Sequence, residues 1–220
     1  MHPIAIEGEY LLVLQESLFK PLLRSQHLGF GIVAGSSRTR NEHLDGAFRY
    51  GCAPPNSSPT ERLTDRAQAA IALDRNNARA YQQLGLTLMS LGQPDAAIPQ
   101  IKKAIRLNPH DPNIASYYWA LGSANLVSGH LDDAAILLSK ARAANPRLFF
   151  IHFWLPASLA LKGNLDEARS ALADSIALKR EITSLARWRA ESPWYTNPEF
   201  VTLAEKTLYA GLRRAGFPDN

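Results

Sequence analysis

The sequence predicts an all-α protein, a short α-solenoid in which antiparallel helices stack in pairs. From Glu61 onward, apolar residues recur at the three- and four-residue spacing of amphipathic helices. Glycines recur as well, since Gly92, Gly129 and Gly163 lie 37 and 34 residues apart. Self-similarity at such a period is typical of solenoids, in which each unit buries its apolar face against its neighbours.

Each recurring column has a place in a helical hairpin. The glycines are expected to end a first helix, because a residue without Cβ adopts the left-handed conformation at least cost. An acid follows each glycine and is expected to cap the second helix, where a carboxylate satisfies free N–H groups and the helix dipole. At the other recurring positions, bulky residues are expected to pack into a neighbouring helix, and small residues are expected to let two helices approach closely. The columns are Asp95, Asp132 and Asp166 (acids), Tyr81 and Tyr118 (bulky), Gly85 and Gly122, and Ala97, Ala134 and Ala168 (small).

These columns resemble the tetratricopeptide repeat. The clearest unit has Leu84-Gly85, Ala97 and Pro109 at the signature positions and has the family's 34-residue length. The resemblance implies helix–turn–helix units with a C-terminal capping helix. The expected parts are an N-terminal extension without a consistent period (1–58), an array over 59–182 with a half-repeat (61–75) and three repeats (78–111, 115–148 and 149–182), and capping helices (183–220).

The chain departs from the family pattern at four positions. Pro156 stands inside the first helix of the third unit and Pro99 inside a second helix, where a proline removes a backbone hydrogen bond. His152 replaces the usual aromatic residue and is expected to hydrogen-bond locally, and Asn125 replaces a large apolar residue. We expect these changes to weaken the geometry of the third unit more than the existence of the array.

The residues around Asn197 predict one more helix. Asn197 is an N-cap, Pro198 suits the first helical position and Glu199 suits the first turn. An apolar stripe follows along one face: Phe200, Leu203, Ala204, Thr207, Leu208, Gly211 and Leu212. The last pair of a solenoid exposes an apolar face, so we expect this helix to close it.

The resemblance implies a peptide-binding groove on the concave surface of the first helices. One series of residues beside the packing face of each first helix, the groove series, is expected to line it: Gln82, Leu86 and Met89; Trp119, Ser123 and Leu126; and Phe153, Ala157 and Ala160. This apolar surface favours a peptide or helix of another protein, anchored on Trp119 and Phe153. The alternative is that the protein's own C-terminal or N-terminal helix fills the groove. Family members that clamp a peptide carboxylate use Lys, Asn and Arg there, and this series does not match them.

The tail from Tyr209 to Pro218 is similar to the extreme C-terminus of bacterial multidomain proteins with a class III adenylate/guanylate cyclase or DNA-binding module, a TolB-like region and tetratricopeptide repeats. The cyclase domain is absent from this sequence, so its activity transfers to no residue here. The resemblance implies an alternative function, an accessory or regulatory module, or a relic, of a cyclase-type or transcription-regulator signalling protein.

Composition argues against several other classes of protein. The net charge is a mild +4, with basic residues scattered over polar helix faces, so no nucleic-acid partner is expected. The N-terminus lacks a basic region before its short apolar run, and no segment is long enough to span a bilayer. We therefore expect a cytoplasmic protein without a membrane partner. Self-association through the exposed end of the array is a further option.

No catalytic or metal-binding group is readable from the residues. The single cysteine, Cys52, has no partner for a disulfide, and the six histidines are not at metal-ligand spacing. The acidic pairs Asp132-Asp133 and Asp166-Glu167 recur at helix starts, where capping explains them. The glycine-rich stretch 29–35 lacks the strand and the spacing of a dinucleotide-binding loop. The sequence therefore predicts a scaffold that is not an enzyme and needs no cofactor.

Overall fold

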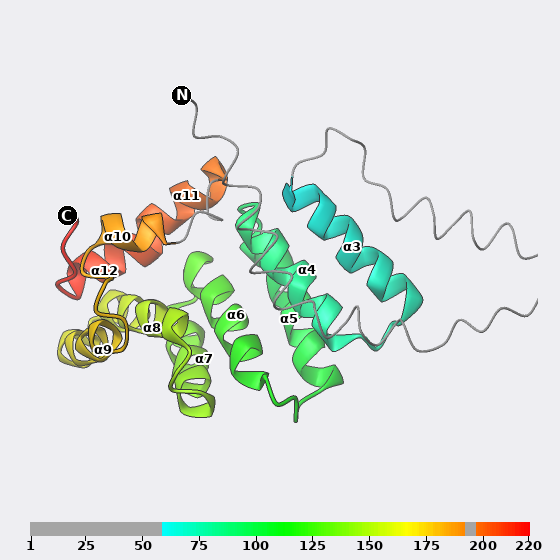
Figure 1. Ribbon diagram of the computed structural model, residues 1–220, viewed down its shortest axis with the longest axis horizontal. Helices are drawn as coiled ribbons and strands as arrows, with labels where there is room; N and C mark the ends of the chain where they lie inside the picture. Colours follow the sequence, from blue (N-terminus) through cyan, green and yellow to red (C-terminus); the bar gives the residue numbers. More distant parts are fainter. Residues whose placement is uncertain (1–58, 192–196) are drawn as a thin grey trace, which may run out of the picture. The chain divides into compact units, whose positions relative to one another are not determined.

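The computed structural model describes residues 59–191 and 197–220, which lie within one compact unit of the chain, Ala53–Asn220. The regular elements of these residues are all helical. Figure 1 shows three successive hairpins: α4 (Ala78–Ser90) with α5 (Pro94–Leu107), α6 (Ile114–Val127) with α7 (Leu131–Ala144), and α8 (Phe149–Lys162) with α9 (Leu165–Leu178). The predicted all-α solenoid is confirmed. The predictions for residues 1–58, including the loop around Cys52, lie outside the described residues.

Consecutive hairpins are joined through their second helices. Helix α5 packs on α6, and α7 packs on α8. One further helix, α3 (Pro59–Leu73), packs on α4 in the same way, through the buried side chains of Leu63 and Ala67. Helix α3 therefore takes the place of a second helix ahead of the first hairpin.

Glycines shape the hairpins at two kinds of position. Gly92, Gly129 and Gly163 have φ angles of 76°, 83° and 95°, in the left-handed region that favours glycine, and each follows a first helix. Gly122 lies inside α6, where a Cβ atom would be 2.8 Å from Cγ of Leu138 on α7. The missing side chain at Gly122 therefore lets the two helices of this pair approach closely.

The recurring aspartates lie in the first turns of the second helices but do not cap them through their side chains. The N-cap residues of α5, α7 and α9 are instead Gln93, His130 and Asn164, and none of them makes a side-chain capping bond. The capping prediction is wrong for these side chains, because each lies two positions after the N-cap residue of its helix. Their place in the first turn still suits the helix dipole.

Two of these aspartates instead connect one hairpin to the next. The Ser128 hydroxyl at the end of α6 donates to Oδ1 of Asp95 on α5 at 2.8 Å. Nζ of Lys162, at the end of α8, lies 2.8 Å from Oδ1 of Asp132 on α7. In both cases the start of a second helix contacts the end of the following first helix. The third, Asp166, pairs with Arg169 of its own helix.

The last four helical elements follow the third hairpin: α10 (Leu185–Ala190), α11 (Pro198–Ala204), the π-helix η1 (Glu205–Tyr209) and α12 (Ala210–Arg214). Oδ1 of Asn197 accepts hydrogen bonds from the backbone N–H groups of Glu199 and Phe200, so the predicted helix start is confirmed. In an α-helix, residues four apart drift by about 40° per step around the axis. The wider i→i+5 turns of η1 offset this drift. Four residues at four-residue spacing are therefore all buried: Phe200, Ala204, Leu208 and Leu212.

Gly122→Ala is expected to lower the free energy of unfolding by roughly 1–3 kcal/mol, because its new methyl group would overpack against Leu138. Helix propensity alone predicts the opposite sign, a gain of up to about 1 kcal/mol. Chemical denaturation followed by circular dichroism measures the change. The double variant with Leu138→Ala is the control, since the added methyl group should cost less there. A stabilised single variant would contradict the close approach of α6 and α7.

Candidate interaction surface

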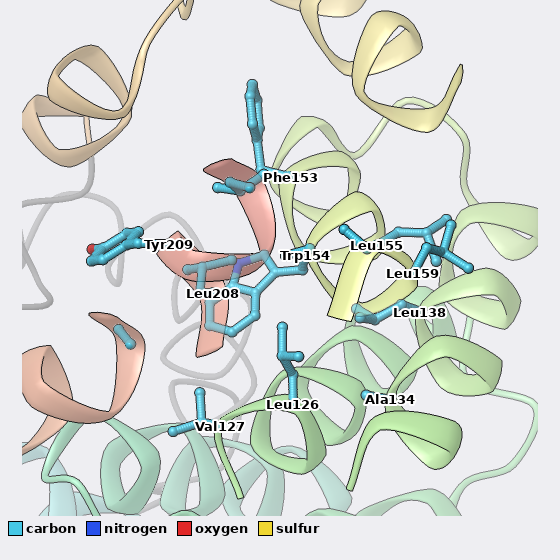
Figure 2. Close-up of a cluster of buried hydrophobic side chains, with 14 of the residues drawn as sticks. Leu126, Val127, Ala134, Leu138, Phe153, Trp154, Leu155, Leu159, Leu208 and Tyr209 are labelled. Atoms are coloured by element: carbon cyan, nitrogen blue, oxygen red, sulfur yellow. The ribbon is translucent and has the colours of Figure 1, made fainter. Parts of the chain in front are cut away.

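Helix α8 lies in the middle of the packed structure, and its residues 151–160 are all buried. Figure 2 shows Leu155 and Leu159 on the side that faces Leu138 of α7, whereas Trp154 points toward Leu208 of η1. The second helices α7 and α9 cover one side of α8, and elements from the C-terminal part of the chain cover another. A first helix of a solenoid ordinarily keeps its concave side open, and α8 does not.

The cover over α8 is the C-terminal segment, which we define as residues 197–220. Both η1 and α12 contact α8, and η1 also contacts α6. A Cβ atom at Gly211 would lie 2.4 Å from the carbonyl oxygen of Ala157. At the other end of the segment, a Cβ atom at Gly92, just beyond α4, would lie 2.6 Å from Cβ of Glu199. The segment therefore reaches from the end of the first hairpin's α4 to the third hairpin's α8.

Most of the groove series is buried in this arrangement. The ring of Phe153 lies 4.4 Å from that of Trp188 and 5.5 Å from that of Phe217, measured between centroids. Ala157 is covered by Gly211. The buried members of the series are Gln82, Met89, Ser123, Leu126, Phe153, Ala157 and Ala160. Beside α8, the protein's own C-terminal segment covers the groove series. This is the arrangement that the sequence left open as an alternative.

Two members of the groove series, Leu86 on α4 and Trp119 on α6, keep partly exposed side chains. Trp119 meets Trp154 edge-on, with centroids 6.4 Å apart and an interplanar angle of 83°. Next to them, Nε2 of Gln82 donates to the Ser116 hydroxyl at 2.9 Å and ties α4 to α6. We call Leu86 and Trp119 the open strip, because their side chains keep part of their surface exposed while the other members of the series are buried.

Polar contacts join the C-terminal segment to α10. Glu205 pairs with Arg189 of α10 and, at 3.2 Å, with Nη1 of Arg213 on α12. Nε of Arg213 also donates to Oδ1 of Asp219 at 2.8 Å. The backbone N–H of Leu185 donates to the carbonyl of Pro218 at 2.9 Å. These contacts tie α10, η1, α12 and the tail together, and sequence periodicity gave no sign of them because they join separate elements.

A shallow hollow lies between α7 and α9, with His152 of α8 among its lining residues. Nε2 of His152 hydrogen-bonds the carbonyl oxygen of Pro146 at 2.8 Å, as the predicted local bond requires. Burial lowers the pKa of His152 below its ordinary value of 6.5, so the imidazole is neutral at pH 7. Arg142 and Asp174 border the hollow with side chains 3.9 Å apart. This pair is too exposed and too long to fix a ligand by itself.

Within residues 59–191 and 197–220, no cluster of three or more His, Cys, Asp or Glu side chains is placed to hold a metal ion. The helices described in this range are also too short or too polar for any of them to cross a membrane.

Comparison with known families identifies the repeats. A family model described as tetratricopeptide repeat matches residues 83–148, and a second with the same description matches residues 67–98. Residues 67–148 therefore match the tetratricopeptide repeat. Neither match reaches the tail, so the resemblance of residues 209–218 to cyclase-type proteins gains no support from them. No curated protein matches the sequence.

Solved structures similar to the chain include several of MamA. One crystal structure of MamA is 21% identical with a TM-score of 0.51, covering 83% of this chain and 97% of its own. A second is 23% identical with a TM-score of 0.54, covering 80% and 91%. A MamA double mutant is 16% identical with a TM-score of 0.52, covering 83% and 97%. At these identities the likeness shows the helical fold alone.

The buried His152 is expected to make stability depend on pH. The pKa of His152 is lower in the folded state than in the unfolded state. Its contribution to the free energy of unfolding is therefore fully present above about pH 6.5, and it is lost as the pH falls from there through the folded-state pKa. The free energy of unfolding should therefore fall between pH 7 and pH 5, and His152→Phe should flatten this dependence. Urea denaturation across this range measures it. The control is His130→Gln, an exposed position; a slope unchanged by His152→Phe would contradict a neutral buried imidazole.

Proposed function

We propose that the protein is a non-catalytic scaffold that binds a peptide or helix of another protein on the concave face of its repeats. The observation that carries this proposal is the open strip. Leu86 and Trp119 come from neighbouring first helices and remain partly exposed, while the rest of the series is buried. Partly exposed apolar side chains on a rigid surface favour contact with a partner.

The surroundings of the open strip support this role. Trp119 is held by its edge-on contact with Trp154, and the Gln82–Ser116 hydrogen bond fixes α4 against α6. A side chain that is already ordered loses little conformational entropy when a partner binds. Tryptophan is also enriched among the residues that dominate binding energy. We therefore place the primary contact on Trp119, with Leu86 beside it.

The predicted site is wider than the open strip. Phe153 and Ala157 of α8 take part in partner binding only if the C-terminal segment leaves them, because Phe217 and Gly211 cover them. Met89, Ser123 and Leu126 act from beneath the surface, where they position the first helices. The proposed site is accordingly centred on α4 and α6.

The alternative function is that of an accessory module of a cyclase or transcription regulator. In that case the same surface would bind the cyclase or the regulator. The tail residues that carry that resemblance have packing roles here, since Gly211, Leu212, Ala215 and Phe217 are buried. Packing therefore accounts for them without a cyclase ancestor. Identification of the bound protein by mass spectrometry separates the two: a cyclase or transcription regulator as the main partner favours the alternative.

Trp119→Ala is expected to weaken binding of a purified partner by about thirtyfold or more, the effect of losing a side chain worth about 2 kcal/mol at an interface. Isothermal titration calorimetry measures the dissociation constant, and thermal unfolding measures stability. Ile136→Ala on α7 is the control, because Ile136 is 53% exposed on a second helix. Unchanged affinity together with a lowered melting temperature would show that Trp119 serves the core instead.

A further inference from the structure

The C-terminal segment runs farther than closing the array requires. A cap needs to cover only the last repeat of a solenoid. This segment contacts α8 through α12 and η1, contacts α6 through η1, and reaches the end of α4 at Gly92 through Glu199 and Phe200. Its course therefore runs from the turn that follows α4, past α6, to α8, so it meets the first helix of a hairpin, or the end of one, in all three hairpins.

We infer that this part of the concave face is a helix-binding groove, and that the C-terminal segment is its resident ligand. The inference rests on the proposed function and names the class of partner. A partner that enters this groove is an amphipathic helix with the same stripe, and it takes the place of the segment. Binding of such a helix and docking of the segment exclude each other.

The resident segment defines the stripe. Phe200 is fully buried at the end beside α4, and Leu208 is fully buried where η1 crosses α6 and α8. At Gly211 there is no room for a Cβ atom, which would lie 2.4 Å from the Ala157 oxygen and 2.8 Å from its Cα. A partner helix therefore needs an aromatic residue at its start, a leucine in the middle and a glycine three residues after that leucine.

The polar contacts of the segment with the rest of the protein are exposed, so they add little resistance to its release. Of the two ion pairs of Glu205, the one with Arg189 attaches the segment to α10, and Arg189 lies in an exposed position. The pair with Arg213 lies within the segment itself. Exposed ion pairs are weak and are screened by salt. The covalent link through residues 192–196 keeps the segment near the groove, which gives it a high effective concentration. A free helix of the same sequence therefore competes poorly with the tethered one until the link is cut.

The test uses the whole chain with a protease recognition sequence inserted within residues 192–196. After folding, the protein is cut at that site and mixed with fluorescently labelled synthetic peptide 197–220, and binding is followed by fluorescence anisotropy. The cut protein is expected to exchange its segment for the labelled peptide. The uncut protein is expected to bind it at least about a hundredfold more weakly, because its own segment is tethered.

Matched variants test whether the exchange is specific. Peptide carrying Gly211→Leu should not bind, because the new side chain meets the Ala157 backbone, whereas Lys206→Ala changes an exposed residue and should bind like the parent. In the uncut chain, Glu205→Ala removes the ion pair with Arg189, so the tethered segment should dock less tightly and the peptide should bind more strongly. Lys206→Ala should leave peptide binding unchanged. An unrelated helical peptide given the aromatic, leucine and glycine positions should displace the labelled peptide, and its scrambled version should not.

Three results would overturn the inference. They are a cut protein that holds its segment without exchange against excess peptide, a cut protein that loses its helical circular dichroism, and equal binding of the Gly211→Leu peptide. The first two would make the segment a permanent part of the core, and the third would make peptide binding nonspecific. The exchange requires no external protein, so its failure is distinct from a failure to find a partner for Leu86 and Trp119.

Discussion

Helix α8 has apolar side chains all around its axis, and a hairpin partner covers only one of its sides. Phe153, Trp154 and Leu155 follow one another in the sequence, so at 100° per residue they point in three different directions. Leu155 meets α7, but Phe153 and Trp154 need cover from elsewhere. Burying such side chains contributes about 1.5–3 kcal/mol each, which is a large part of the stability of a domain this size. The position of the C-terminal segment follows from this constraint.

The segment meets this constraint with two kinds of contact that have different strengths. Its buried stripe of Phe200, Leu208 and Leu212 supplies most of the stabilisation, since exposed ion pairs contribute about 0–1 kcal/mol each. The pair of Glu205 with Arg189 instead helps to fix the register of the segment, because it joins the segment to α10, whereas the pair with Arg213 lies within the segment. The π-helix η1 keeps both halves of the stripe on the same face. The predicted groove series is thus divided into members that are buried in the structure and the partly exposed pair Leu86 and Trp119.

Local chemistry in the sequence predicted the hairpins, because their signals lie within one unit. The left-handed residues at Gly92, Gly129 and Gly163 and the helix start at Asn197 all depend on neighbours a few residues away. The occupant of the groove was left open, since it depends on segments about 50 residues apart, such as Ala157 and Gly211. The roles of the aspartates were also missed, because a carboxylate at a helix start looks the same whether it caps that helix or contacts the next hairpin. Pro99 and Pro156 lie inside the continuous helices α5 and α8, so neither breaks its hairpin.

Amide hydrogen exchange of the intact protein tests most directly whether α8 is covered on every side. The account predicts that the amides of residues 151–160 are among the slowest to exchange in the described chain. They should exchange more slowly than those of α3, which among the described helices packs mainly on α4. Exchange is measured residue by residue by nuclear magnetic resonance in deuterated buffer. Exchange of α8 as fast as that of α3 would contradict the account, because it would place α8 at an open edge of the array.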